Sequence, residues 1–333
     1  MTKAIALLPH SSDNRADTLA TNYPPGAIWP RIRHLRSRYV TLAILRDRFE
    51  ELPHQWAQPT VRPWGKVAWA AVQPDQLVGI DRETFCAILL GAINTEAPIR
   101  GYTQSSRQYL ADLYPAMARF VGGRVDDTGQ LIEIGLWERE EKRHTPALIK
   151  LYTQLKGAKP AIAPHAARPH QPAPDPQENL YRHGLHRVAT EYGATCLYLW
   201  LMAHSTGALQ AVLAELLVDE INHMTKFWGF GQWAYPDSSL LKISTTLGRA
   251  LVAKLGDRTT QGSLLHTLRR MMRELAWGRW SLTHRLTFLY TLAQVITVVG
   301  QWHRTLTPDY LTAVLGARPI PEGATTSPEN LLL

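Results

Sequence analysis

The chain has 333 residues, of which 45% are hydrophobic, so it can bury one large core or two modest ones without an external scaffold. Its two cysteines, Cys86 and Cys196, lie within apolar runs, which argues against a disulfide framework and predicts a reducing compartment. The formal net charge of +8 favours acidic partners. No zinc-finger spacing, basic heptad region or aromatic RNA-binding signature accompanies this charge, so nucleic acid is not expected as a partner.

Residues 1–80 mix prolines and tryptophans, and we expect an N-terminal cover segment with one helical stretch at 32–49. The first apolar run is too short for a signal peptide and is interrupted by Pro9, which predicts a cytoplasmic protein. Arginines cluster in two places: Arg31, Arg33, Arg36 and Arg38 near the N-terminus, and Arg269, Arg270, Arg273, Arg279 and Arg285 near the C-terminus.

The central segment, residues 81–235, has the apolar periodicity of long helices, and the predicted fold class is all-α. Asp81 is a good N-cap for the first helix. On the second helix, Ile134, Trp137 and Leu148 recur on one face at the helical period. The four predicted helices span 81–114, 131–155, 179–205 and 208–227.

A Pro/Ala-rich connector, residues 157–178, separates the second and third helices. About twenty residues of partly polyproline chain reach on the order of 60 Å, whereas a helix of about 25 residues is roughly 38 Å long. The chain can therefore return to its starting end, so that helices two and three run parallel, as in four-helix bundles with one long crossover. A disordered linker between domains is the alternative interpretation.

Residues 236–333 are expected to form a C-terminal helical extension packed on the bundle. Helical stretches are predicted at 240–255, 264–277 and 282–303. The run 286–302 is the most apolar, but its length and its Thr, Gln and Gly content favour a buried helix over a membrane span. A peripheral contact with a membrane is the alternative.

Two of the predicted helices carry a Glu-x-x-His pair, Glu141 with His144 and Glu220 with His223. Residues three apart are neighbours on one helical face, so a carboxylate oxygen and an imidazole nitrogen can reach the same metal ion. A third such pair, Glu51 with His54, contains Pro53 and has no apolar helical face around it. We interpret that third occurrence as chance.

Both glutamates of the bundle pairs stand among apolar residues at helical spacing, which predicts that they point inward. The other two helices each supply one further glutamate in an apolar setting, Glu96 and Glu191. An unpaired buried carboxylate is unfavourable, so these groups must be protonated, paired with a cation or bound to metal. Two divalent cations would balance four carboxylates, whereas exposed helical charges or hydrogen-bonded core histidines are the alternatives for each residue taken alone.

At this point the chain resembles the soluble acyl-acyl carrier protein desaturases of the ferritin-like di-iron superfamily. The resemblance spans about 81–227 and depends on INTEAPIRGYTQ around Glu96, WEREEKRH around Glu141, HRVATEYGATCLYLW around Glu191 and DEINH around Glu220. It implies a ferritin-like four-helix bundle with additional N- and C-terminal helices.

The resemblance also implies a ligand set. Glu96, Glu141 and His144 would hold one iron ion, and Glu191, Glu220 and His223 the other, with Glu141 and Glu220 bridging; a mixed manganese and iron pair is the alternative. Asp219 and Glu140 would hold the second nitrogen of each histidine. Thr195, which lies four residues after Glu191 rather than three, would be the threonine that handles oxygen. Pro146 and Pro98 are expected to bend the helices beside the site.

The resemblance favours an oxygen-dependent di-iron oxidoreductase that removes hydrogen from an acyl chain. The partners expected are an acyl carrier protein or another acidic protein that docks on the arginines, an electron donor such as ferredoxin, and a second copy of the chain in a homodimer. Trp137, Trp200 or Trp228 would conduct electrons, although packing alone explains each of them. The alternatives are a hydroxylase or N-oxygenase acting on a small molecule, a ferroxidase or other iron-handling protein, and a metal-free helical binding module.

Overall fold

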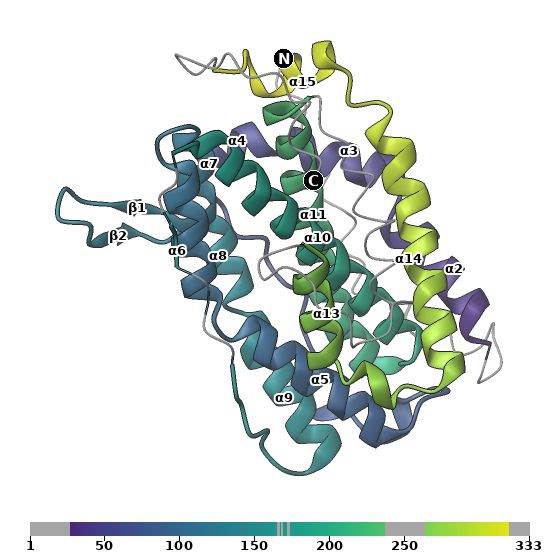
Figure 1. Ribbon diagram of the computed structural model, residues 1–333. Coiled ribbons are helices and arrows are strands. Elements are labelled where there is room, and N and C mark those ends of the chain that lie inside the picture. The colour runs from purple at the N-terminus through teal and green to yellow at the C-terminus, as the bar shows by residue number, and fades with distance from the viewer. Residues whose placement is uncertain (1–26, 165–166, 168, 172–173, 237–263, 320–333) are drawn as a thin grey trace.

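The computed structural model describes residues 27–164, 167, 169–171, 174–236 and 264–319. Within these residues the fold is all-α, as the periodicity predicted, and the one sheet is a two-stranded hairpin (Figure 1). The stretch 240–255, for which a helix was predicted, lies outside the described residues.

The N-terminal segment contains α2 (Ile28–Tyr39), α3 (Leu42–Glu50) and α4 (Leu52–Ala57), rather than the single helix predicted at 32–49. The division falls at Thr41, whose extended backbone ends one helix and whose hydroxyl accepts the Ile44 N–H of the next. Helix α2 packs on the third long helix and α3 on the fourth, so the segment covers the bundle. Two short 3₁₀ turns follow, η1 (Trp69–Ala71) and η2 (Pro74–Gln76).

The first bundle helix is divided at a proline. Helix α5 (Arg82–Glu96) begins after Asp81, whose carboxylate accepts the Thr84 N–H as predicted. It ends at Glu96, and α6 (Ile99–Leu110) begins after Pro98. Proline has no N–H to donate, so the single helix predicted for 81–114 is wrong in its continuity. Helix α7 (Pro115–Gly122) completes this part of the chain.

The second bundle helix starts later than predicted. Its predicted first turn instead forms β2 (Leu131–Glu133), which pairs with β1 (Arg124–Val125). The Asp126 carboxylate and the positive φ of Gly129 build the tight turn between the two strands. Ile134 is consequently 36% exposed instead of buried. The helices are α8 (Leu136–Glu141) and α9 (His144–Lys156), with Pro146 in the first turn of the latter.

The third and fourth helices are α10 (Pro176–Ala203) and α11 (Gly207–Ala234). They form an antiparallel pair, since the Tyr235 hydroxyl beyond the end of α11 donates to the Gln177 carbonyl at the start of α10. Helices α5 and α9 form a second antiparallel pair, because Lys156 at the end of α9 pairs with Glu83 at the start of α5.

The connector between the two pairs runs back along α5 and α6. The Ala163 N–H donates to the Asn94 side chain, and further on the Gln171 N–H donates to the Tyr109 hydroxyl. Helices α9 and α10 therefore point in the same direction, the arrangement that the length of the connector allows (Figure 1).

The C-terminal part consists of α13 (Leu264–Glu274), η3 (Trp277–Arg279), α14 (Leu282–His303) and α15 (Pro308–Leu315). Helix α14 packs on α2, α3 and α10. Of the described helices it alone has the length and hydropathy to cross a membrane, and 39% of its apolar window is buried against the rest of the chain.

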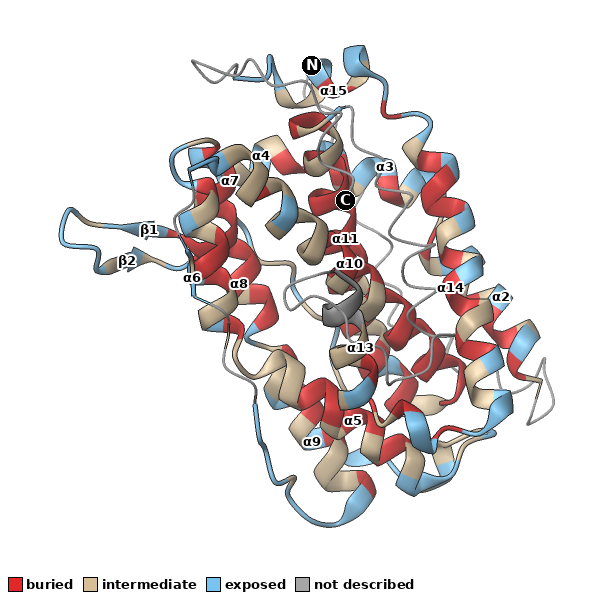
Figure 2. Ribbon diagram, in the orientation of Figure 1, coloured by how far each residue is buried: buried red, intermediate tan, exposed pale blue. Residues whose placement is uncertain are grey.

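Buried residues concentrate along α10 and α11 at the centre of the molecule, whereas the outer helices expose one face (Figure 2). Cys86 and Cys196 are buried and unbonded, as predicted. The centre also contains ionisable groups, among them the fully buried His144 and His223. Such groups require partners in the interior.

Helix α13 lies so close to α5 that a side chain at Gly91 has no room. A Cβ atom there would stand 2.2 Å from the Glu274 carbonyl oxygen, whereas a Cβ at Gly184 on α10 would meet no atom within 4 Å. Gly91→Ala should therefore lower the free energy of unfolding by about 1–3 kcal/mol. Gly184→Ala should raise it by up to about 1 kcal/mol, because alanine favours the helix. Urea denaturation measures both, and equal effects would contradict the close contact of α13 with α5.

Candidate metal centre

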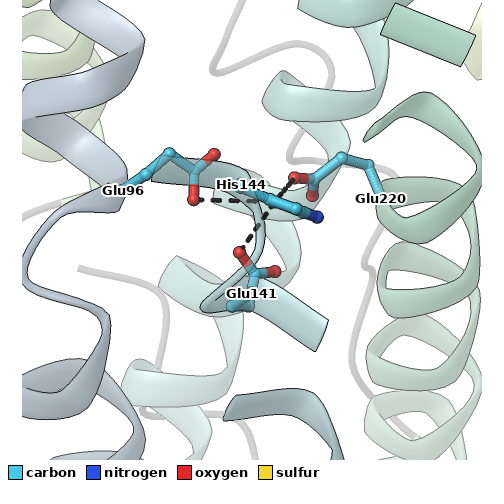
Figure 3. A group of neighbouring side chains, drawn as sticks. All are labelled: Glu96, Glu141, His144 and Glu220. Atoms are coloured by element: carbon cyan, nitrogen blue, oxygen red, sulfur yellow. Dashed lines mark ion pairs between the residues drawn. The ribbon is translucent and has the colours of Figure 1, made fainter. Parts of the chain in front are cut away.

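The six side chains singled out in the sequence converge at one level of the bundle, and they come from every bundle helix. They form two overlapping groups, each with ligand atoms within 4.8 Å of one another. Glu141 and Glu220 belong to both groups. The first group adds Glu96 and His144 (Figure 3), and the second adds Glu191 and His223.

His144 directs its Nδ1 atom at the first group (Figure 3). This nitrogen lies 3.1 Å from Glu141 Oε2, 3.2 Å from Glu220 Oε1 and 3.9 Å from Glu96 Oε2. His223 Nδ1 lies 2.8 Å from Glu141 Oε1 and 3.8 Å from Glu191 Oε2. The two oxygens of Glu141 therefore face different histidines, the geometry expected of a carboxylate between two cations.

Three of these buried atoms have no hydrogen-bond partner in the part of the chain that the structure describes: His144 Nδ1, His223 Nδ1 and Glu220 Oε1. They approach neighbouring ligand atoms closely, but the directions required for hydrogen bonds are not met. Buried polar atoms are seldom left in this way. Converging nitrogen and oxygen atoms of this kind suit cations such as iron or manganese, so the residues present fit a pair of metal ions.

Further contacts hold the carboxylates in place. The Trp137 indole N–H donates to Glu141 Oε1 at 2.9 Å, and the Tyr198 hydroxyl donates to Glu96 Oε1 at 3.0 Å. Arg187 Nη1 lies 3.5 Å from Glu191 Oε1. The ligand atoms are thus oriented by groups of fixed position before any ion binds.

Asp219 and Glu140 stand directly behind the histidines. Asp219 Oδ2 lies 3.3 Å from His144 Nε2, and Glu140 Oε2 lies 3.0 Å from His223 Nε2. The arrangement is crossed, because each carboxylate belongs to one Glu-x-x-His helix and contacts the histidine of the other. Such contacts fix the Nε2–H tautomer and leave Nδ1 free to bind metal.

Three residues near the site were not found from the sequence. The Arg62 Nε donates to Asp219 Oδ1 at 2.7 Å, while the Trp64 indole N–H and Arg143 Nη2 each donate to Asp219 Oδ2 at 2.8 Å. Arg62 and Trp64 lie in an irregular segment without periodicity, so no sequence pattern indicated them. Arg143 is part of the WEREEKRH motif, and its position beside His144 was a usable signal.

Other candidates lie further from the cluster. Glu51 pairs with Arg48, and His54 is exposed, so the third Glu-x-x-His pair takes no part in either ligand group. Thr195 is buried one turn beyond Glu191, and its hydroxyl has no hydrogen-bond partner among the described residues. A role for Thr195 in oxygen handling stays a prediction.

The three tryptophans predicted to conduct electrons differ in position. Trp137 donates to Glu141, whereas Trp200 stacks on Trp280 with ring centroids 4.6 Å apart, and Trp228 donates to His303. Only Trp137 among them has a hydrogen bond to the ligand set.

Without metal, protons hold the cluster together. Burial, and then the charge of Glu141, raise the pKa of Glu96 to about 8, and the same two causes raise the pKa of Glu220 well above its usual value. Burial opposes ionisation of Glu141 as well, but His144 and His223 overcome it and lower the pKa of Glu141 well below its usual range. Burial likewise opposes the imidazolium forms, yet Glu141 raises the pKa of both histidines.

Two apolar pockets flank the cluster. The Glu96 pocket, about 590 Å³ including its mouth, lies between α5, α10, α13 and α14, and Tyr198, Met271 and Phe288 are among its walls. The Arg187 pocket, about 520 Å³ including its mouth, lies between α6, α7, α10 and α11, and its wall includes Phe227 and Arg187, the residue that pairs with Glu191. Each half of the cluster therefore has its own apolar neighbourhood.

The chain matches no protein-family model, no curated protein and no solved structure with which it was compared. The evidence for a metal centre is therefore the geometry and chemistry of the cluster itself.

Metal binding at this cluster should release protons. The raised pKa values of Glu96, Glu220 and the two histidines mean that these groups hold protons more readily without metal, and they must lose those protons to bind a cation. The apparent affinity for Fe²⁺ should therefore rise between about pH 6 and 8, and the contribution of Glu96 should level off above its pKa of about 8. Anaerobic calorimetry in two buffers of different ionisation enthalpy measures the release. Identical heats in both buffers would contradict it.

Proposed function

We propose that the protein is a non-haem di-iron oxidoreductase that uses dioxygen, with the ferritin-like bundle that the sequence resemblance implies. The observation that carries the proposal is the pair of overlapping ligand groups joined by Glu141 and Glu220. Two antiparallel helix pairs joined by a long connector, with one Glu-x-x-His pair on each of two chain segments, are the arrangement found in such bundles.

Each residue has a defined part in this proposal. Glu96 and His144 would hold one ion, Glu191 and His223 the other, and Glu141 and Glu220 would bridge them. When bound, the two ions would supply the redox chemistry that activates dioxygen. Four carboxylates balance two divalent cations, so loading leaves the buried centre formally neutral. A mixed manganese and iron pair has the same charge and suits the same ligands.

An acyl chain is the substrate that the surroundings favour. The Glu96 pocket is lined by apolar side chains apart from Glu96, Thr95 and Tyr198, and it adjoins the first ligand group. Such a lining excludes water and holds an unreactive hydrocarbon segment beside the metal. An acidic acyl carrier protein would dock on the exposed arginines of the two clusters, Arg33, Arg38, Arg273 and Arg279. Arg31 takes no part, because it is buried and donates to the Ala203 and Ser205 carbonyls.

The test is a single-turnover assay combined with metal analysis. We expect about two metals per chain. With reducing equivalents, oxygen and a saturated acyl chain on its carrier protein, the product should be lighter by two hydrogen atoms. Glu141→Ala and Glu220→Ala should each lose one or both metals and the product, because each carboxylate serves both ions. Glu133→Ala is the matched control, because Glu133 lies on the hairpin and pairs with Arg119 of α7. This variant should keep both metals and the product.

Other outcomes would replace the proposal. A product that gains an oxygen atom would indicate a hydroxylase or an N-oxygenase. A large shell holding hundreds of irons per particle would indicate iron storage or detoxification. A chain that binds no metal would be a helical binding module.

Electrons have a direct route to the centre through Trp64. Its indole donates to Asp219, which contacts His144, and its ring is half-buried at the edge of the molecule beneath the Arg143 guanidinium. Hydrogen bonds thus connect the half-buried Trp64 indole, through Asp219, to His144. A donor such as ferredoxin would deliver electrons at this side.

Trp64→Phe should slow reduction of the loaded centre by about 10–100-fold, because it removes the indole N–H while keeping an aromatic ring. Stopped-flow mixing with reduced ferredoxin at saturating metal measures the rate. Trp69→Phe is the matched control, because the Trp69 ring also lies under a cation, Lys150, but is not among the hydrogen-bond partners of Asp219 in the described residues. Equal rates in both variants would rule out this route.

A further inference from the structure

Arg62 contacts both of the carboxylates that stand behind the histidines. Its guanidinium Nε donates to Asp219 Oδ1 at 2.7 Å, and its backbone N–H donates to Glu140 Oε1 at 2.9 Å. It comes from the irregular segment between α4 and η1, outside all of the bundle helices. One residue therefore joins two carboxylates that lie on α8 and α11.

Each of these contacts leads on to one histidine. Asp219 contacts His144, and Glu140 contacts His223, so Arg62 is two contacts away from both imidazoles. The two routes use different parts of the residue, since the side chain serves the His144 half and the backbone serves the His223 half.

Arg62 is itself fixed in place. Glu215 accepts from Nη1 through its side chain at 2.7 Å and from Nη2 through its carbonyl at 2.8 Å. The Arg62 carbonyl accepts a bond from Arg143 Nη1 at 2.6 Å. The side chain is 18% exposed, so this guanidinium has little freedom to leave Asp219.

Asp219 depends on the side chain of Arg62, whereas Glu140 depends on its backbone N–H. Asp219 Oδ2 has three partners, Trp64, Arg143 and His144, whereas Oδ1 is bonded by Arg62 alone among the described residues. The carboxylate is fully buried. Without the guanidinium, Oδ1 would lose its hydrogen bond and the carboxylate could rotate away from the histidine.

We infer that Arg62 is a positioning residue of the metal centre, which orients His144 through Asp219 with its side chain and His223 through Glu140 with its backbone N–H. The inference rests on the proposed function, since it presupposes that the cluster binds metal. It has a selective consequence. A side-chain substitution keeps the backbone N–H, so it should disturb the His144 half and leave the His223 half intact.

Co²⁺ is the probe, because its visible absorption reports binding and its paramagnetism shifts the imidazole N–H protons of bound histidines in the proton NMR spectrum. The wild-type protein should bind two Co²⁺ ions and show two such signals, one per histidine. In Arg62→Gln, affinity at the His144 half should fall by about 10–100-fold, and one N–H signal should shift or exchange faster. Asp219→Asn, which breaks the same route, identifies that signal.

Two more variants complete the experiment. Arg62→Lys keeps the charge, but lysine cannot reach Asp219 and Glu215 together. Its loss of Co²⁺ affinity should therefore be smaller and confined to the His144 half. This variant provides the test if Arg62→Gln does not fold. Arg119→Gln is the matched control, because Arg119 also joins the N-terminal segment to the bundle, through the Trp56 carbonyl and Glu133, away from the metal centre. It should leave both signals and both affinities unchanged.

The outcomes separate the two ideas. A wild-type chain that fails to bind two Co²⁺ ions contradicts the proposed function itself. Two bound ions with unaltered signals in the Arg62 variants overturn the role of Arg62 alone. Equal disturbance of both halves, or the same loss in Arg119→Gln, would show general loosening of the fold and would also overturn it.

Discussion

Four carboxylates and two imidazoles share the interior of this bundle, and their mutual neutralisation is the constraint on which the rest of the structure depends. Like charges at such short range in an apolar surrounding are strongly unfavourable. Without metal, protons on Glu96 and Glu220 and on the histidines relieve the repulsion. Two divalent cations would balance the four carboxylates. The residues that destabilise the metal-free fold are therefore the same residues that could bind metal.

Three of the six side chains of the cluster lie at helix ends. Glu96 is the last residue of α5, Glu141 is the last of α8, and His144 is the first of α9. The pair Glu141 and His144 thus spans a helix break, yet it keeps the spacing of a continuous helix because Lys142 and Arg143 retain right-handed helical backbone angles. On α11 the equivalent pair sits in an unbroken helix. The two halves of the candidate centre therefore have the same types of side chain, but one Glu-x-x-His pair spans a helix break and the other lies within a single helix.

The sequence predicted the converging side chains because they repeat at fixed spacing on apolar helical faces, a pattern that survives without tertiary information. Prediction from the sequence was wrong or incomplete where the structure depends on contacts between distant segments. The strand at Leu131–Glu133 was read as helix, since its pairing with β1 has no local signature beyond the turn at Gly129. Arg62 and Trp64 were overlooked because an irregular segment shows no period, and their importance arises only from the buried carboxylate of Asp219 that they meet.

The outer helices complete the surroundings of the site. The C-terminal end of α13 rests on Gly91, and the Met271, Met272 and Leu275 side chains close the Glu96 pocket on that side. In the N-terminal part of the chain, α2 packs on α10 and α3 packs on α11. The outer helices therefore leave five of the six candidate side chains buried and Glu96 only slightly exposed.

The most direct measurement is anomalous X-ray scattering from crystals of the iron-loaded protein. We expect two iron peaks about 3.5–4 Å apart, with Glu141 and Glu220 between them and one histidine Nδ1 bound to each. A single ion, ions bound elsewhere, or histidines that bind through Nε2 would contradict it.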